Sequence, residues 1–144
     1  MANTTPDGAD DFNARIIEEF RANEGRVSGP LAGTPIILIH HIGARSGIER
    51  VTPLVCNSHE DGRFVIVASN GGSPTHPSWY HNLRAHPRIA VEVGTRTFPV
   101  LAEELAGTAR AEVWSKLVAG SPALREFQAN APRRIPVFLL TPQG

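Results

Sequence analysis

The sequence is poor in several features that mark specialised classes of protein. Its 144 residues include one cysteine, one lysine and one tyrosine, and its acidic and basic residues balance to a net charge of zero at pH 7. Proteins that bind nucleic acid or anionic membranes usually carry a clear basic excess. The balanced charge therefore argues against a polyelectrolyte partner, and we expect no nucleic acid among the partners.

Two further absences concern the cellular compartment. Cys56 has no second cysteine for an intrachain disulfide, and the polar, acidic first residues lack the basic and apolar regions of a signal peptide. The longest apolar run, at 36–39, is far shorter than the roughly 18 residues of a membrane span. We therefore expect a reducing, cytoplasmic setting.

What the sequence does contain fits one domain with its own hydrophobic core. We predict a disordered tail at 1–9 and a helix over 11–23, because apolar residues recur there at helical spacing. The apolar face Phe12–Phe20 leaves three partners open: the rest of the domain, a second copy, or a membrane surface. Acidic residues on the same helix count against the membrane.

The remaining pattern favours strands over helices. Strands are predicted at 36–42, 51–57, 64–69, 89–93, 97–101 and 135–140, and helices at 77–86, 108–118 and 123–130. The Asp61-Gly62 turn predicts that 51–57 pairs with 64–69, and Pro53 favours an edge position. Because strands and helices do not alternate regularly, we predict the α+β class, with a mainly antiparallel sheet or small barrel.

Two glycine-containing loops offer the chemistry of an anion site. Residues 43–47 read GARSG and residues 68–72 read ASNGG, each at the end of a predicted strand. Free backbone amides in such turns can surround an anion, and the guanidinium groups of Arg45 and Arg50 can pair with a phosphate or carboxylate. Ordinary tight turns with solvated arginines would give the same pattern, and neither loop matches a known phosphate-binding motif.

The helix predicted after the second loop has one apolar and one polar side. Ser78 and Asn82 share a face, as do Trp79 and Leu83. The polar face could bond a planar ligand, and the alternative is a core tryptophan on a capped helix. We expect no metal site, because Cys56 and His59 lack a second pair of ligands at suitable spacing.

Three stretches, in this order, resemble the deazaflavin-dependent nitroreductase family of actinobacteria. They are GARSGIERVTPL at 43–54, IVASNGGSPTHPSWYHNLRAHP at 66–87 and RRIPVFLLTP at 133–142. Members of this family use coenzyme F420, a flavin-like hydride carrier. The resemblance implies a split β-barrel akin to the FMN-binding barrels, with residues 10–144 as one F420-binding domain.

The resemblance also implies which residues hold the cofactor. The segments that contact its phosphate and tail in relatives correspond to Ala44, Arg45, Ser46, Arg50, Val51, Thr52 and Pro53. The segments that line its ring and ribityl chain correspond to Val67, Ala68, Ser69, Asn70, Gly71, Ser78, Trp79, Tyr80, His81 and Asn82. We expect Ser69 to hydrogen-bond the substrate or the reactive ring edge, as the catalytic residue. The hydride chemistry itself belongs to the cofactor.

The sequence departs from this family in one segment. Some characterised relatives carry several tyrosines just before the last strand, whereas residues 120–134 contain none. Ser121, Leu124 and Phe127 stand in their place, which predicts a more apolar substrate pocket and argues against nitroimidazole reduction.

Two functions of different classes follow from these observations. The first is an F420H2-dependent reductase that passes a hydride to a small conjugated acceptor such as a quinone or enone. The second is a non-catalytic protein that carries or sequesters F420 or a related flavin or haem. A homodimer and a peripheral contact with the membrane quinone pool both stay open as interactions.

Overall fold

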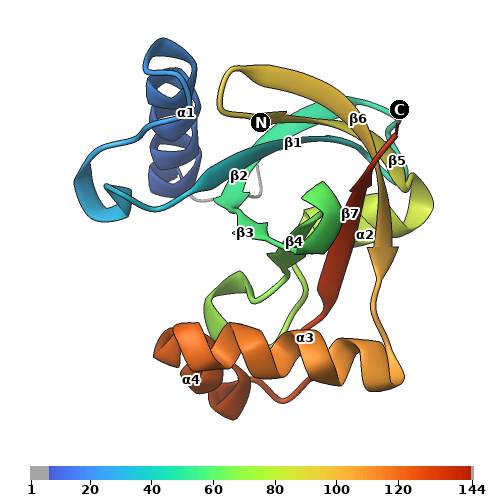
Figure 1. Ribbon diagram of the computed structural model, residues 1–144. Helices are drawn as coiled ribbons and strands as arrows, with labels where there is room; N and C mark the ends of the chain where they lie inside the picture. Colours follow the sequence, from blue (N-terminus) through green and yellow to red (C-terminus); the bar gives the residue numbers. More distant parts are fainter. Residues whose placement is uncertain (1–6, 144) are drawn as a thin grey trace.

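The computed structural model describes residues 7–143, which form four helices and seven strands (Figure 1). The helices are α1 (Asp7–Ala22), α2 (Ser78–Ala85), α3 (Gly107–Gly120) and α4 (Pro122–Asn130). The strands are β1 (Ile36–Ile42), β2 (Glu49–Val55), β3 (Asn57–Ser58), β4 (Phe64–Val67), β5 (Arg88–Val93), β6 (Arg96–Glu104) and β7 (Val137–Pro142). Three single 3-10 turns are η1 (Gly29–Leu31), η2 (Glu60–Gly62) and η3 (Asn70–Gly72).

All seven strands belong to one curled sheet in the order β2-β1-β5-β6-β7-β4-β3. Every neighbouring pair is antiparallel, which confirms the predicted α+β class. The two edge strands, β2 and β3, follow each other in the chain with only Cys56 between them. Because this short link joins the opposite edges, the sheet must curl back toward itself as a partial barrel (Figure 1).

Strand β1 shows how the sequence fills both faces of this sheet. Successive side chains of a strand point to opposite faces. Ile37 and Ile39 therefore enter the core inside the barrel, whereas Ile36 and Leu38 face the other side. The interior core also receives residues from β4, β5, β6, β7 and α2, among them Ile66, Trp79, Leu83, Val91, Val100, Phe138 and Leu140.

Helix α1 covers the outer face of β1. Ile16 and Phe20 are buried against Ile36 and Leu38, and Figure 1 shows the helix standing beside this part of the sheet. The apolar face of the helix thus covers its own barrel, so neither a membrane nor a second copy is needed to bury it. Among residues 7–143, no helix is long and apolar enough to cross a bilayer.

Helices α3 and α4 lie together beneath β4 and β7 (Figure 1). Val113 of α3 is buried with Val65 and Val137, and Trp114 packs against the same cluster. In Figure 1 the segment after β4 descends to α4 before the chain returns into α2. The predicted helices at 77–86, 108–118 and 123–130 are therefore confirmed to within a few residues.

Two expectations need correction. Helix α1 begins at Asp7, so residues 7–9 are helical rather than part of a tail, and residues 1–6 lie outside the described range. The predicted pairing of 51–57 with 64–69 is wrong for most of its length. Strand β2 pairs with β1 over seven residues, and only Asn57 and Ser58 pair with β4. Strand β2 ends at Val55, and the amide of the next residue, Cys56, still donates to the Pro35 carbonyl just before β1, at 2.9 Å.

Candidate functional site

The predicted site residues differ in how far solvent reaches them. The exposed ones are Ala44, Arg45, Ser46, Arg50, Asn70, Ser78 and His81. The half-buried ones are Val51, Thr52, Pro53, Val67, Ser69, Leu124 and Phe127. The buried ones are Ala68, Trp79, Tyr80 and Asn82. Gly71 lies in the turn η3.

Loop one, residues 43–48, connects β1 to β2 and is closed by its own hydrogen bonds. The Gly43 amide donates to the Ile48 carbonyl, and the Gly47 amide donates to the Gly43 carbonyl, both at 2.9 Å. The Ala44 amide donates instead to Oδ1 of Asn82 in α2, at 2.8 Å. This bond fixes loop one against helix α2. It also removes one of the amides expected to be free for an anion.

Two cations and two amides of this region keep unused donors. Arg45 and Arg50 are exposed and enter no hydrogen bond or ion pair with the residues that the structure describes. Within the same described range, the amides of Arg45 and Ser46 donate to no protein atom. A phosphate or carboxylate at loop one would therefore meet cationic and amide donors that have no competing partner.

A buried polar chain runs from loop one through α2 and β1 to β2. Nδ2 of Asn82 donates to Nδ1 of His41 at 2.9 Å, and the ring Nε2 of His41 lies 2.8 Å from Oγ1 of Thr52. Because Nδ1 accepts, the ring proton of a neutral His41 lies on Nε2 and is donated to Thr52. The hydroxyl of Thr52, which is half-buried, then keeps its own proton to donate to another acceptor.

The electrostatics of His41 agree with this neutral form. Its side chain is 2% exposed. Burial lowers the pKa of His41 from its ordinary 6.5 to about 4, and the positive charge of Arg50 contributes in the same direction. His41 is therefore a neutral structural link at physiological pH.

Loop two, residues 68–76, has a backbone conformation whose amides can donate to a bound anion or other acceptor. Ser69 is in the right-handed helical region and Asn70 in the left-handed one, with φ of +48°. This succession of conformations turns neighbouring amides to one side, forming the concavity that binds anions in many proteins. Among the described hydrogen bonds, none uses the amide of Ser69 or Asn70 as donor.

Loop two is also packed against α4. A side-chain carbon built at Gly72 would lie 3.3 Å from the backbone of Phe127, so only glycine fits there without displacement. Phe127 thus lies beside η3, next to the predicted cofactor loop. This places one predicted substrate-pocket residue within reach of that loop, and Leu124 lies one turn earlier on the same helix.

Helix α2 contributes mainly buried side chains, which belong to the interior core. Trp79 and Tyr80 are each 6% exposed and lie against Phe138 with ring centroids 5.9 and 5.7 Å away. Most of each ring therefore lies in the core, as the alternative of a core tryptophan predicted for Trp79. Only Ser78 and His81 present exposed side chains from the predicted part of this helix.

Two residues of the site were not on the predicted list. His41 is the first, and its alternation with Ile37 and Ile39 along the predicted strand is the signal that places it on the buried face. Arg133 lies outside α4 and before β7, and its guanidinium contacts loop two. No local pattern distinguishes Arg133 from Arg134 beside it, so tertiary structure was required to identify it.

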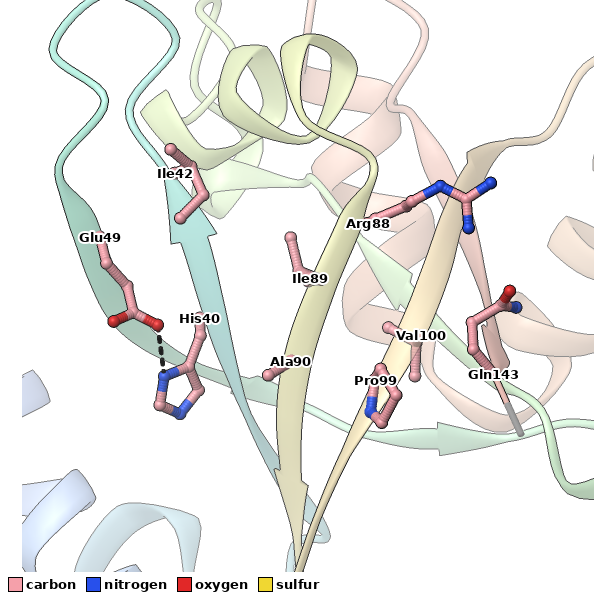
Figure 2. Close-up of a pocket in the computed structure, with 9 residues that line it drawn as sticks. All are labelled: His40, Ile42, Glu49, Arg88, Ile89, Ala90, Pro99, Val100 and Gln143. Atoms are coloured by element: carbon pink, nitrogen blue, oxygen red, sulfur yellow. Dashed lines mark hydrogen bonds and ion pairs between the residues drawn. The ribbon is translucent and has the colours of Figure 1, made fainter.

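A groove lies elsewhere on the described surface, on the outer face of β1, β5 and β6 (Figure 2). It has a volume of about 290 Å³ and is lined partly by Ile42, Ala90 and Pro99. At its edge His40 lies 3.0 Å from a carboxylate oxygen of Glu49 (Figure 2). No predicted cofactor residue lines this groove, so it does not form part of the loop-one and loop-two site.

Comparison with known proteins agrees with the fold and with the matched motifs. A family model described as F420H(2)-dependent quinone reductase matches residues 14–142. A protein of Mycobacterium tuberculosis (strain H37Rv) that bears the same description is 35% identical over 127 residues. That alignment spans 85% of this chain and 84% of the mycobacterial protein.

Two solved structures are similar over most of the chain. A structure of an F420-H2 dependent reductase, FDR-A, is 41% identical with a TM-score of 0.66, and the match covers 74% of this chain and 93% of that one. A structure described as a domain-swapped dimer is 36% identical with a TM-score of 0.68, over 92% of this chain and 98% of that one. The likeness to FDR-A confirms the predicted split β-barrel.

Proposed function

This chain belongs to the F420H(2)-dependent quinone reductase family, and we propose that it is an enzyme that uses reduced F420 to reduce a small quinone. The observation that carries the proposal is the convergence of the predicted segments on helix α2. Loop one is bonded to Asn82 of α2, and loop two leads directly into that helix. The family match adds the identity of the cofactor.

The residues present suit a cofactor with a phosphate-bearing tail. Arg45 and Arg50 supply two exposed cations without acidic partners in the described structure, and the amides of Ser69 and Asn70 are unused. We assign the phosphate end to loop one because the free cations are there. The ring end then falls to loop two, where the small residues Ala68 and Ser69 let a planar group approach.

The protein's own part is to bind, orient and exclude water. When bound, reduced F420 would supply the hydride, and a quinone that accepts it also takes up a proton to become the hydroquinone. The Ser69 hydroxyl is proposed to hydrogen-bond the quinone oxygen or the ring edge. Leu124 and Phe127 of α4 are proposed to hold the apolar quinone beside loop two.

Several finer assignments belong to the same proposal. Residues 10–144 are proposed to act as one F420-binding domain. The cofactor contacts predicted for the individual residues between Ala44 and Asn82 are likewise proposed. The buried Trp79 and Tyr80 are proposed to act through the packing of α2. A homodimer is proposed from the similar structure described as a domain-swapped dimer.

The experiment is a turnover assay with the purified full chain. Reduced F420 and menadione are mixed with the protein, and the return of the absorption band of oxidised F420 is followed. Protein-dependent oxidation that requires the quinone supports the reductase. Tight F420 binding without quinone-dependent oxidation would instead identify a carrier, and preferential binding of FMN or haem would overturn the assignment of the cofactor.

The same assay also tests an enone acceptor. Replacing menadione by a cyclic enone at equal concentration compares the two acceptor classes directly. Because no tyrosine lies in residues 120–134 to protonate an acceptor, we expect the quinone to react faster.

A further inference from the structure

Arg133 makes an unusually complete set of hydrogen bonds to loop two. Its Nε donates to the Ser73 carbonyl at 3.0 Å. One terminal nitrogen lies 3.2 Å from the Ala68 carbonyl and 2.9 Å from Nδ1 of His76. The other lies 3.3 Å from the Ala68 carbonyl and 3.0 Å from the Ser69 carbonyl. A guanidinium has five N–H donors, and all five are directed at this one loop.

The contacts of Arg133 are not those of an ordinary ion pair. Among the described residues, no carboxylate lies within ion-pair distance of its guanidinium. Its partners are neutral carbonyls and the imidazole of His76, which stacks on Tyr80 with ring centroids 4.1 Å apart. Among the described residues, the positive charge behind loop two therefore faces the dipoles of peptide carbonyls and of an imidazole rather than a carboxylate.

The direction of these bonds determines which way the loop's amides point. A trans peptide group is planar, so its N–H points opposite to its C=O. The Ala68 and Ser69 carbonyls point toward Arg133, which turns the following amides, those of Ser69 and Asn70, away from it. Neither of these two amides has an acceptor in the described structure.

We propose that Arg133 is a positioning residue that holds the Ser69 and Asn70 amides toward bound F420. This inference rests on the proposed function, since it assigns the ligand that accepts from those amides. The guanidinium draws the carbonyl ends of two peptides inward and leaves their N–H ends for the ligand. Gly72, packed on Phe127, holds the loop from the α4 side.

The alternative is that Arg133 only fastens loop two to the segment before β7. A matched control separates the two roles. Arg110 also fastens this segment, because its guanidinium donates to the Ile135 carbonyl at 2.5 Å, but within the described structure it makes no hydrogen bond to loop two. Replacing it should cost stability without disturbing the Ser69 and Asn70 amides.

The test compares R133K and R110K with the wild-type chain. Lysine keeps the charge but loses the fork that bonds several carbonyls at once. We expect R133K to raise the Kd for oxidised F420 about tenfold, whereas R110K should leave it within about twofold at a comparable loss of Tm. In turnover, R133K should raise the KM for F420H2 while the KM for menadione changes less.

Hydrogen exchange on the wild-type protein provides an independent readout if R133K fails to fold. Exchange of the Ser69 and Asn70 amides should slow when F420 is added. An unchanged Kd in R133K, an equal weakening in R110K, or unaltered exchange at both amides would overturn the inference. A wild-type chain that binds no F420 would refute the proposed function instead.

Discussion

His41 and Asn82 are 41 positions apart in the chain, yet Nδ2 of Asn82 donates to Nδ1 of His41 at 2.9 Å inside the barrel. Both side chains are buried, and Asn82 also accepts from the Ala44 amide. A buried polar group that loses its partner retains the full cost of desolvation. The pair therefore couples the conformation of loop one to the seating of helix α2.

The first prediction concerns the loss of this link. In N82A, the Ala44 amide and Nδ1 of His41 both lose their partners, so the free energy of unfolding should fall by about 2–4 kcal/mol. Urea denaturation measures the change. The control N23A removes an exposed amide whose one partner among the described residues is the Glu19 carbonyl, and it should cost less than about 1 kcal/mol. Equal losses in the two variants would contradict the role of the buried chain.

The second prediction is a pH dependence of stability. The folded protein holds the pKa of His41 at about 4, whereas the unfolded chain has the ordinary value of 6.5. Between these values only the unfolded state binds the proton, so stability falls as the pH drops from 6.5 toward 4. The slope from this group reaches about 1.4 kcal/mol per pH unit, and above pH 6.5 it contributes none.

Urea denaturation at a series of pH values checks this slope. H41Q removes the titrating ring while leaving a polar side chain, so the difference in stability between wild type and H41Q should shrink as the pH falls through this window. A difference that stays constant from pH 7 to pH 4.5 would show that His41 does not titrate as its burial requires.

The third prediction tests the anion site of loop one. Removing both free cations in R45A/R50A should weaken F420 binding by about 1–3 kcal/mol, toward the lower end because both side chains are exposed. The effect should diminish at high salt. The double variant R15A/R26A removes one exposed arginine within α1 and one that follows it, and it should bind F420 as the wild type does. Unchanged affinity in R45A/R50A would remove the assignment of the phosphate to loop one.

The fourth prediction concerns the contact between loop two and α4. Gly72 and Gly62 both have positive φ, at +83° and +73°, but only Gly72 has a neighbour where a side-chain carbon would stand. G62A should therefore cost about 1–2 kcal/mol from backbone strain alone, and G72A should cost more because it also displaces Phe127. G72A should in addition raise the KM for menadione. If G72A is no less stable than G62A, the packing of Phe127 on the loop is not tight.

The elements that local pattern predicted well are those whose signals are local. The strands predicted at 36–42, 89–93 and 97–101 each depend on the pattern of neighbouring residues, and the structure confirms them as β1, β5 and β6. Pro53 correctly marked an edge strand. The partner of that strand was predicted wrongly, because the Asp61-Gly62 turn is equally compatible with a hairpin that includes only Asn57 and Ser58.

The sequence by itself determined the fold class, the family and the residues of the two loops, because periodicity and motif are properties of nearest neighbours along the chain. Only the tertiary structure decided that the Ala44 amide donates to Asn82, that Trp79 lies in the core, and that Arg133 rather than Arg134 bonds loop two. These outcomes depend on contacts between segments 38 to 65 residues apart. Such contacts are selected by how the curled sheet brings its strand ends together, which no local pattern encodes.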